Sequence, residues 1–173
     1  MFITPLSMTE YVVAQMISGA IKAVVPFGRV SLIALLVFGF NLFAIGFITP
    51  ALLFVNLLCF AYSIGLIILG IILRMGTRIQ ALAWGLVLIF QPLTAAYYPL
   101  DVMPPPLQAV ARVLPPTYVF EAARASLSTP GVHWEYMAIA AGQNVLYFAL
   151  AIWFFAYMYR RSRQIGQFAR NEE

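Results

Sequence analysis

Residues Gln91 to Arg124, QPLTAAYYPLDVMPPPLQAVARVLPPTYVFEAAR, interrupt a chain that otherwise consists mainly of long apolar runs. The stretch begins as an apolar run and breaks between Tyr97 and Pro99, where a proline-rich region starts. Prolines at 104–106 and at 115–116 then bound two short amphipathic segments. This alternation predicts two short helices joined at prolines, each of about ten residues and roughly 15 Å, which is too short to cross a bilayer.

The composition is that of an integral membrane protein. The 173 residues are 63% hydrophobic and only 9% charged, whereas soluble domains carry roughly 25% charged residues. The mean hydropathy is +0.91. The start of the chain shows no charged region followed by a short apolar core and a cleavage site, so no removed signal peptide is expected. We therefore expect an all-α fold, a polytopic bundle of membrane helices.

Four uncharged apolar runs are each long enough to cross a hydrocarbon core of ~30 Å. Thr49 and Pro50 predict a tight break between the first two runs. The predicted transmembrane helices cover residues 30–48, 51–73, 79–98 and 136–159.

The N-terminal segment predicts a separate amphipathic helix. Ser7 and Glu10 form a capping-box pattern, which indicates a helix over residues 7–24 that ends before Pro26 and Gly28. Its polar and apolar side chains fall on opposite arcs at 3.6 residues per turn. Such a helix beside a membrane span typically lies along the interface. The alternative is a docking surface for a cytoplasmic partner.

The basic residues predict the orientation, because Lys and Arg collect on cytoplasmic flanks. Only Arg112 and Arg124 fall on the opposite side from the other basic residues. Both termini are therefore expected in the cytoplasm, and the segment from Pro99 to His133 outside. The pI of about 9.5 then reflects topology and does not indicate a nucleic-acid partner. The residues on the cytoplasmic side are Lys22, Arg29, Arg74, Arg78, Arg160, Arg161, Arg163 and Arg170.

The sequence contains no motif for catalysis or for binding a metal or a nucleotide. The predicted spans carry no ionisable side chain away from their ends, which argues against a proton- or ion-coupled pump. With His133 as the only histidine and Cys59 as the only cysteine, a histidine-based metal site has no second histidine to draw on. A Gly-rich phosphate-binding loop is also missing. We expect no catalytic residue, no metal and no cofactor bound by this chain.

Uncharged polar residues remain inside the predicted spans, where they favour hydrogen bonds between helices. The alternative is a weakly polar translocation path, for which Asn41, Gln91 and Thr94 are the candidates. The whole set is Ser31, Asn41, Asn56, Ser63, Gln80, Gln91, Thr94, Gln143 and Asn144.

The two short segments between the last spans are predicted to be re-entrant outer helices within residues 104–127. In the second one, Thr117 is a candidate N-cap, and Glu121 and Arg124 are spaced to pair at i, i+3. Irregular backbone at membrane depth is stable only against protein or beside a water-filled cavity. An external loop resting on the membrane surface is the alternative. One face of the first segment is predicted to carry Leu107, Val110, Ala111 and Leu114.

The run from Tyr98 to Arg124 resembles the signature of ABC-2 type (type-2 ATP-binding-cassette) transporter permeases. In that family a span ends in Y-P and is followed by a Leu/Pro-rich turn, a short amphipathic helix, L-P-x-T-Y and an acidic-x-x-Arg ending. The run T-P-L-S-x-x-E from Thr4 to Glu10 more weakly resembles the family's ATPase-coupling region. The matching outer residues are Tyr98-Pro99, Met103 to Pro106, Leu107 to Val113, Leu114-Pro115, Thr117-Tyr118, and Glu121 with Arg124.

The resemblance implies the permease subunit of an exporter in the bacterial plasma membrane. It would assemble with ABC ATPase subunits, which bind ATP and Mg, and with a second permease copy or homologue. Its substrate would be an amphiphilic, lipid-linked or drug-like molecule. Because the family has six spans, the resemblance also implies a C-terminal part that lacks the first two.

The resemblance assigns roles to two groups of residues. An outer gate would include Tyr98, Pro99, Pro105, Leu114, Pro115, Thr117, Tyr118, Glu121 and Arg124. ATPase coupling would involve Pro5, Ser7, Glu10 and Lys22. A non-transporting membrane scaffold or assembly subunit is the alternative, and an intramembrane enzyme that uses His133 or Asp101 is a more distant one.

Overall fold

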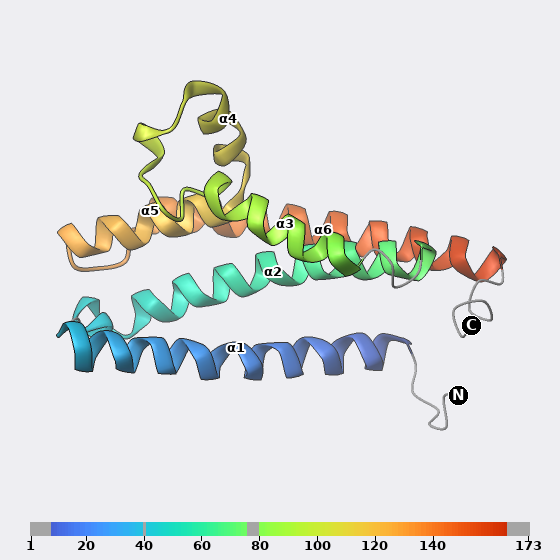
Figure 1. Ribbon diagram of the computed structural model, residues 1–173, viewed down its shortest axis with the longest axis horizontal. Coiled ribbons are helices and arrows are strands. Elements are labelled where there is room, and N and C mark those ends of the chain that lie inside the picture. Colours follow the sequence, from blue (N-terminus) through green and yellow to red (C-terminus); the bar gives the residue numbers. More distant parts are fainter. Residues whose placement is uncertain (1–7, 40, 76–79, 166–173) are drawn as a thin grey trace. The chain divides into compact units, whose positions relative to one another are not determined.

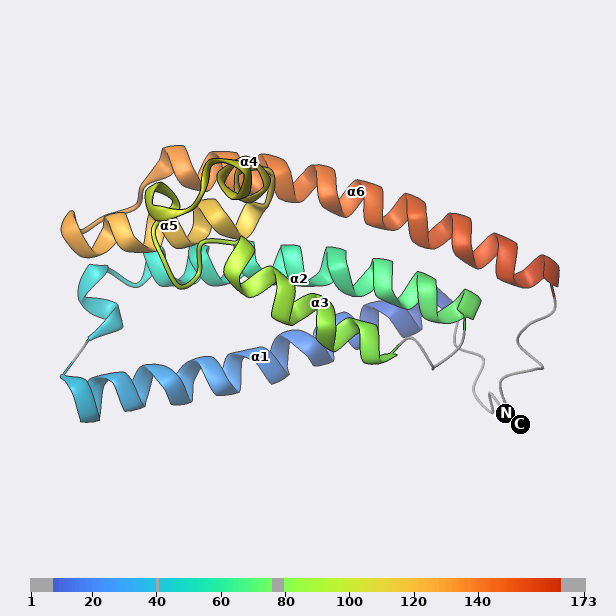
Figure 2. The same cartoon turned by 45° about the horizontal axis from the view of Figure 1, so that its top comes forward.

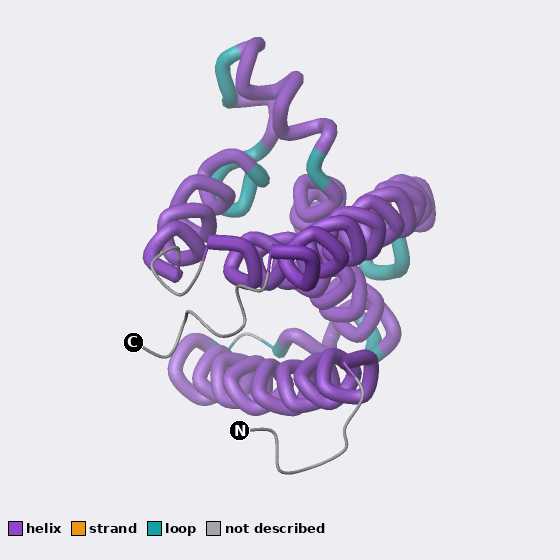
Figure 3. The backbone as a smooth tube through the Cα atoms, turned by 90° about the vertical axis from the view of Figure 1, so that its right-hand side faces the viewer, coloured by secondary structure: helices purple, strands orange, loops and turns teal. Residues whose placement is uncertain are grey.

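The computed structural model describes residues 8–39, 41–75 and 80–165. Within these residues all regular structure is helical, as Figure 3 shows. The chain forms two compact units, Met1–Ala44 and Ile45–Glu173. The expectation of an all-helical membrane fold is therefore confirmed for the part of the chain that the structure describes.

The first unit is dominated by one long helix, α1, Met8–Phe38. The sequence predicted a break at Pro26 and Gly28, with an interfacial helix before it and a span after it, but α1 runs through both residues. A proline removes one backbone donor from a helix, and apolar helices tolerate this loss when neighbouring groups re-satisfy the backbone. In the next turn the Ser31 hydroxyl donates a hydrogen bond to the Phe27 carbonyl at 2.8 Å.

Glycines end α1 earlier than the predicted limit of the first span at residue 48. Gly39 has a φ of 65°, a conformation that favours glycine at a helix C-terminus. Its N–H donates to the Leu35 carbonyl at 3.1 Å. The following residues form the 3₁₀ helix η1, Leu42–Ile45, before the chain turns at Gly46 with a φ of 91°.

Three helices of the described chain are long and apolar enough to cross a membrane, so the predicted number of four is not confirmed. The second starts at Ile48, which places Thr49 and Pro50 in its first turn and not in a loop before it. Proline is well tolerated there because the first N–H groups of a helix have no intrahelical acceptor. The three spans are Glu10–Phe38, Ile48–Arg74 and Trp134–Ser162.

Helices α2, Ile48–Met75, and α6, Trp134–Ile165, form the principal packing interface of the second unit. They lie side by side in Figures 1 and 2. Near the C-terminal ends of both helices, the Ser162 hydroxyl donates to the Leu73 carbonyl at 2.9 Å. Close approach is possible at Gly70, where an added Cβ would already lie 3.4 Å from the Phe154 ring.

Helix α3, Gln80–Leu93, is shorter than the predicted span over residues 79–98, of which residue 79 lies outside the described chain. The Phe60 ring lies 5.7 Å from the rings of both Phe90 and Tyr147, in edge-to-face geometry, so it connects α2 with α3 and α6. At 14 residues, α3 extends about 21 Å.

The segment between α3 and α6 contains three short helices. They are the 3₁₀ helix η3, Leu100–Val102, and the helices α4, Pro105–Val113, and α5, Pro115–Ser128. Figure 1 shows α5 lying along the first part of α6, while α4 stands off to the side of these helices. Helix α5 also contacts α2, so α5 is the member of the pair that is built into the bundle.

Candidate functional site at the outer helices

Prolines start both outer helices. Pro104 is the N-cap of α4, with Pro105 and Pro106 in the first turn, as the sequence predicted. The Gln108 side-chain amide donates to the Met103 carbonyl at 2.8 Å, which fixes the entry of the chain into α4. Because proline lacks an N–H that would need an acceptor, this start leaves fewer unsatisfied donors in an apolar environment.

The junction between α4 and α5 differs from the predicted one at Thr117. The N-cap of α5 is Leu114, and Pro115 is its first residue, so Thr117 lies within the first turn. Its buried hydroxyl donates a hydrogen bond of 2.6 Å back to the Ala111 carbonyl. Thr117 thus binds the end of α4 instead of capping α5, because the two prolines already provide a helix start without donors.

Glu121 and Arg124 of α5 form the predicted ion pair, with 2.8 Å between Arg124 Nη1 and Glu121 Oε1. The same carboxylate oxygen accepts a 2.9 Å hydrogen bond from the backbone N–H of Leu100. The other guanidinium nitrogen, Nη2, donates to the carbonyls of Ala95 and Ala96. We call these five residues the outer clasp. It binds α5 to the end of α3 and to the start of η3.

Ala95 explains why α3 stops before the predicted limit at Tyr98. It has a φ of 55° and is fully buried, in a small core with Met103 and Ala111. A non-glycine residue in this conformation costs of order 1–3 kcal/mol and persists only where surrounding contacts fix it. The charge-assisted hydrogen bonds from Arg124 supply such contacts, since they need the carbonyls of residues 95 and 96 turned out of a helix.

Helix α6 binds the C-terminal end of α4. The Gln143 side-chain amide donates to the Arg112 carbonyl at 2.9 Å, and the Tyr147 hydroxyl donates to the Val113 carbonyl at 3.3 Å. Gln143 lies nine residues and Tyr147 thirteen residues after Trp134, the first residue of α6. At ~1.5 Å per residue these positions are about 14 and 20 Å along the helix from Trp134, and both lie within the candidate membrane span Trp134–Ser162.

The side-chain amides of Asn56 and Asn144 connect α2 with α6, directly after Gln143 in the sequence of α6. Asn144 Nδ2 donates to the backbone carbonyl of Asn56 at 3.0 Å and to its side-chain oxygen at 3.1 Å. Asn56 Nδ2 donates in turn to the Leu52 carbonyl at 3.0 Å. The interpretation of these polar residues as interhelical hydrogen-bonding groups is therefore confirmed for Asn56, Gln143 and Asn144.

Two of the candidate path residues, Gln91 and Thr94, are partners within the turn that ends α3. Gln91 Oε1 accepts a 2.9 Å hydrogen bond from the Tyr97 hydroxyl, and the buried Thr94 hydroxyl donates to the Gln91 carbonyl at 3.3 Å. The third candidate, Asn41, belongs to the first unit. The translocation path stays a prediction.

The other predicted gate residues lie between the end of α3 and the first two turns of α5. Tyr98 and Pro99 are exposed just after α3, with the Tyr98 ring 6.1 Å from that of Tyr97. Leu114 and Pro115 are buried at the α4–α5 junction, and Tyr118 is half-buried on α5. On the predicted apolar face of α4, Ala111 is buried but Leu107 and Val110 are 40% and 47% exposed.

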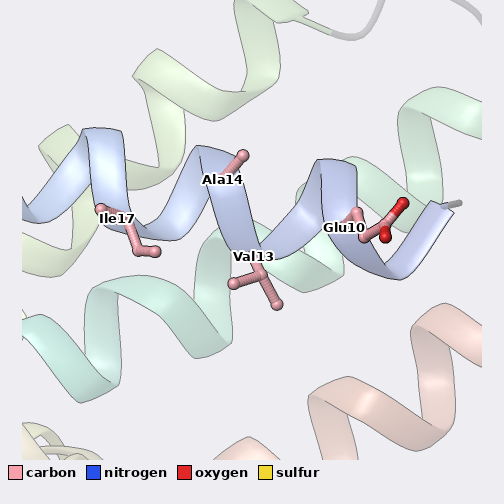
Figure 4. A pocket seen from close by; sticks show the side chains of 4 residues that line it. All are labelled: Glu10, Val13, Ala14 and Ile17. Carbon is pink, nitrogen blue, oxygen red and sulfur yellow. The ribbon is translucent and has the colours of Figure 1, made fainter. Parts of the chain in front are cut away.

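The predicted coupling residues lie at the start of the chain, and Pro5 and Ser7 are outside the described residues. Glu10 and Lys22 are both exposed on α1. Figure 4 shows Glu10 beside Val13, Ala14 and Ile17, which line a shallow hollow along the same helix. This part of α1 thus presents a carboxylate next to an apolar strip.

Sequence reasoning missed Ala95, Ala96 and Tyr147. The first two act through backbone carbonyls, which carry no sequence signal apart from Pro92 just upstream. Tyr147 has no signal beyond its place in an apolar run. Among the described residues no group of three or more His, Cys, Asp or Glu side chains could hold a metal ion.

The family model described as ABC-2 type transporter matches residues 1–128, which end at the last residue of α5. No curated protein and no solved structure matched the chain.

Proposed function

The chain belongs to the ABC-2 type transporter family, and from this premise we propose that it is the permease subunit of an exporter. The proposed cargo is an amphiphilic, lipid-linked or drug-like molecule, which moves outward at the expense of ATP hydrolysed by a separate subunit. The proposed location is the bacterial plasma membrane, with both termini in the cytoplasm.

The observation that carries the proposal is the attachment of the α4–α5 junction to α6, within the candidate membrane span of that helix. Hydrogen bonds from Gln143 and Tyr147 hold this junction about 14–20 Å along α6 from Trp134. Backbone that turns at such depth needs protein or a water-filled cavity beside it. The exposed side of α4 is therefore proposed to border the outer part of a substrate path.

The outer clasp is proposed to hold the outer helices α4 and α5, as an outer gate, at a fixed position relative to α3. The pair Glu121–Arg124 binds backbone groups of Ala95, Ala96 and Leu100, so α5 and the end of α3 would move together. Opening of a path beside α4 would then require movement of this whole assembly and not of a single loop.

The cytoplasmic part of α1 is the proposed contact with the ATPase, which would bind ATP and Mg. The exposed Glu10 carboxylate beside an apolar strip and the exposed Lys22 fit docking against another protein. Pro5 and Ser7 are proposed to belong to the same contact, and a second permease copy or homologue would complete the membrane path.

The proposal predicts that a neighbouring gene encodes an ABC ATPase, and the test is to co-express the full chain with that ATPase and to measure how much of it co-purifies in detergent. The double variant Glu10→Gln, Lys22→Gln should reduce the recovered ATPase about tenfold. Each exposed charged contact contributes about 0.2–1 kcal/mol, and the two together approach the ~1.4 kcal/mol of a tenfold change. Glu135→Gln removes an exposed carboxylate at the start of α6 and is the matched control. ATPase recovery that is unchanged in the double variant would favour a non-transporting scaffold.

A further inference from the structure

Arg112 is a charged residue that the outer clasp does not use. It lies in the last turn of α4, and its side chain is exposed. Its carbonyl is bound by Gln143, which lies within the candidate membrane span Trp134–Ser162, about 14 Å along α6 from Trp134. Under the proposed function, the long arginine side chain therefore extends from inside the membrane toward the outer interface.

The ordinary role of a basic residue in the last turn of a helix is to bind the terminal carbonyls. In α4 other donors already occupy them. The Ala111 carbonyl accepts from the Thr117 hydroxyl at 2.6 Å and from the Leu114 N–H at 3.0 Å. The Arg112 and Val113 carbonyls accept from Gln143 and Tyr147. The guanidinium is thus not needed to end its own helix.

No ion pair involves Arg112 among the described residues of the second unit. The ion pair described there joins Glu121 and Arg124. Of the other carboxylates that the structure describes in this unit, Glu135 lies at the start of α6 and Asp101 on η3. A second copy would bring the same set of carboxylates.

The surroundings of Arg112 on α4 are apolar and open. Val113 is 58% exposed and Val110 is 47% exposed. A guanidinium in hydrocarbon is costly, and such residues usually mark a substrate pathway or a polar partner. A cation flanked by exposed valines matches a ligand with an anionic head and an apolar tail.

We propose that Arg112 binds the anionic headgroup, of phosphate type, of an amphiphile that lies against α4. This inference deepens the proposed function, on which it rests, by assigning a charge to the cargo and a residue that contacts it. The planar guanidinium suits this role because it binds phosphate oxygens through two parallel hydrogen bonds. The exposed valines would contact the first part of the apolar tail.

The test measures binding of two fluorescent lipids, a phosphatidylglycerol and a phosphatidylcholine analogue, to the purified full chain in a neutral detergent. Arg112→Gln should raise the Kd for the phosphatidylglycerol analogue about tenfold, because it removes charge-assisted hydrogen bonds. The Kd for the zwitterionic analogue should stay unchanged. Arg112→Lys should retain part of the preference, and Arg74→Gln, which removes an equal charge from the exposed end of α2, should retain all of it.

Three results would overturn the inference. The first is an unchanged preference in Arg112→Gln. The second is displacement of the bound lipid by inorganic phosphate alone, which would indicate a free anion. The third is loss of self-association in Arg112→Gln without loss of lipid preference, which would assign Arg112 to a second copy. Lipid binding requires no ATPase, and Arg112→Gln should co-purify with the ATPase normally, so failure here is separate from failure of the proposed function.

Discussion

The α2–α6 pair and the outer helices satisfy their backbone groups in opposite ways. Along α2 and α6 the backbone is bonded within each helix, and side chains add only isolated contacts such as Asn144 to Asn56 and Ser162 to Leu73. In the outer segment side chains bind carbonyls that no helix satisfies, from Arg124 at one end to Tyr147 at the other. Single polar side chains should therefore matter far more to the outer segment than to the spans.

The largest effect is expected for Arg124→Ala. The change leaves Glu121 without its partner and the carbonyls of Ala95 and Ala96 without their donor. Because Arg124 and Glu121 are 29% and 21% exposed, we expect a loss of about 2–3 kcal/mol in the free energy of unfolding, below the 3–5 of a fully buried pair. Titration with SDS in mixed micelles measures it. Arg74→Ala is the control. An equal loss of stability in both variants would show that the clasp does not stabilise the fold more than an exposed arginine does.

Ala95→Val should be the next most damaging change. A β-branched residue is strained at a φ of 55° and has no room at a fully buried position. We expect the same titration to show a loss of about 2 kcal/mol. The neighbouring Ala96→Val, at a half-buried site without the positive φ, should cost clearly less. Equal losses would mean that backbone conformation is not what makes Ala95 sensitive.

Asn144→Leu probes the spans instead. It removes the hydrogen bonds to Asn56 from a residue that is 5% exposed, but it leaves both helical backbones intact. Interhelical hydrogen bonds in membranes average about 0.6 kcal/mol, and leucine restores packing, so we expect a loss of at most ~1 kcal/mol. A loss as large as that of Arg124→Ala would contradict the contrast between the two regions.

Tyr147→Phe should have the smallest effect. It removes one hydroxyl and keeps the ring that packs on Phe60. With a hydrogen bond of 3.3 Å, the expected loss is about 0.5 kcal/mol. The more telling readout is local: in detergent, limited trypsin digestion should cut after the exposed Arg112 at the end of α4 faster in this variant. Unchanged cleavage would show that the Val113 carbonyl does not need this donor.

The sequence predicted those features that depend on local rules. Apolar runs located α2 and α6, prolines located the start of α4, and i, i+3 spacing predicted the pair of Glu121 and Arg124. Features that depend on contacts between distant segments were not predictable in this way. The early end of α3 at Ala95 and the backward bond of Thr117 both depend on backbone carbonyls, and carbonyls are common to every residue.

Proline shows the limit of local rules most directly. Pro26 was expected to end a helix, and α1 passes through it, whereas Pro92 precedes an actual end of a helix by one residue. The two prolines differ in the hydrogen bonds made by the residues just after them. After Pro26 the Ser31 hydroxyl binds the Phe27 carbonyl inside the helix, whereas after Pro92 the carbonyls of residues 95 and 96 are bound by Arg124 from outside it.

The contacts between α4 and α6 also constrain the order of biogenesis. The donors for the last carbonyls of α4 come from Gln143 and Tyr147, and both are synthesised after α4 and α5. Until α6 has entered the bilayer, the last carbonyls of α4 lack the donors that α6 supplies. An unsatisfied carbonyl is costly among lipid tails. The two outer helices should therefore wait at the membrane surface during translation and settle to their final depth only as the last helix inserts.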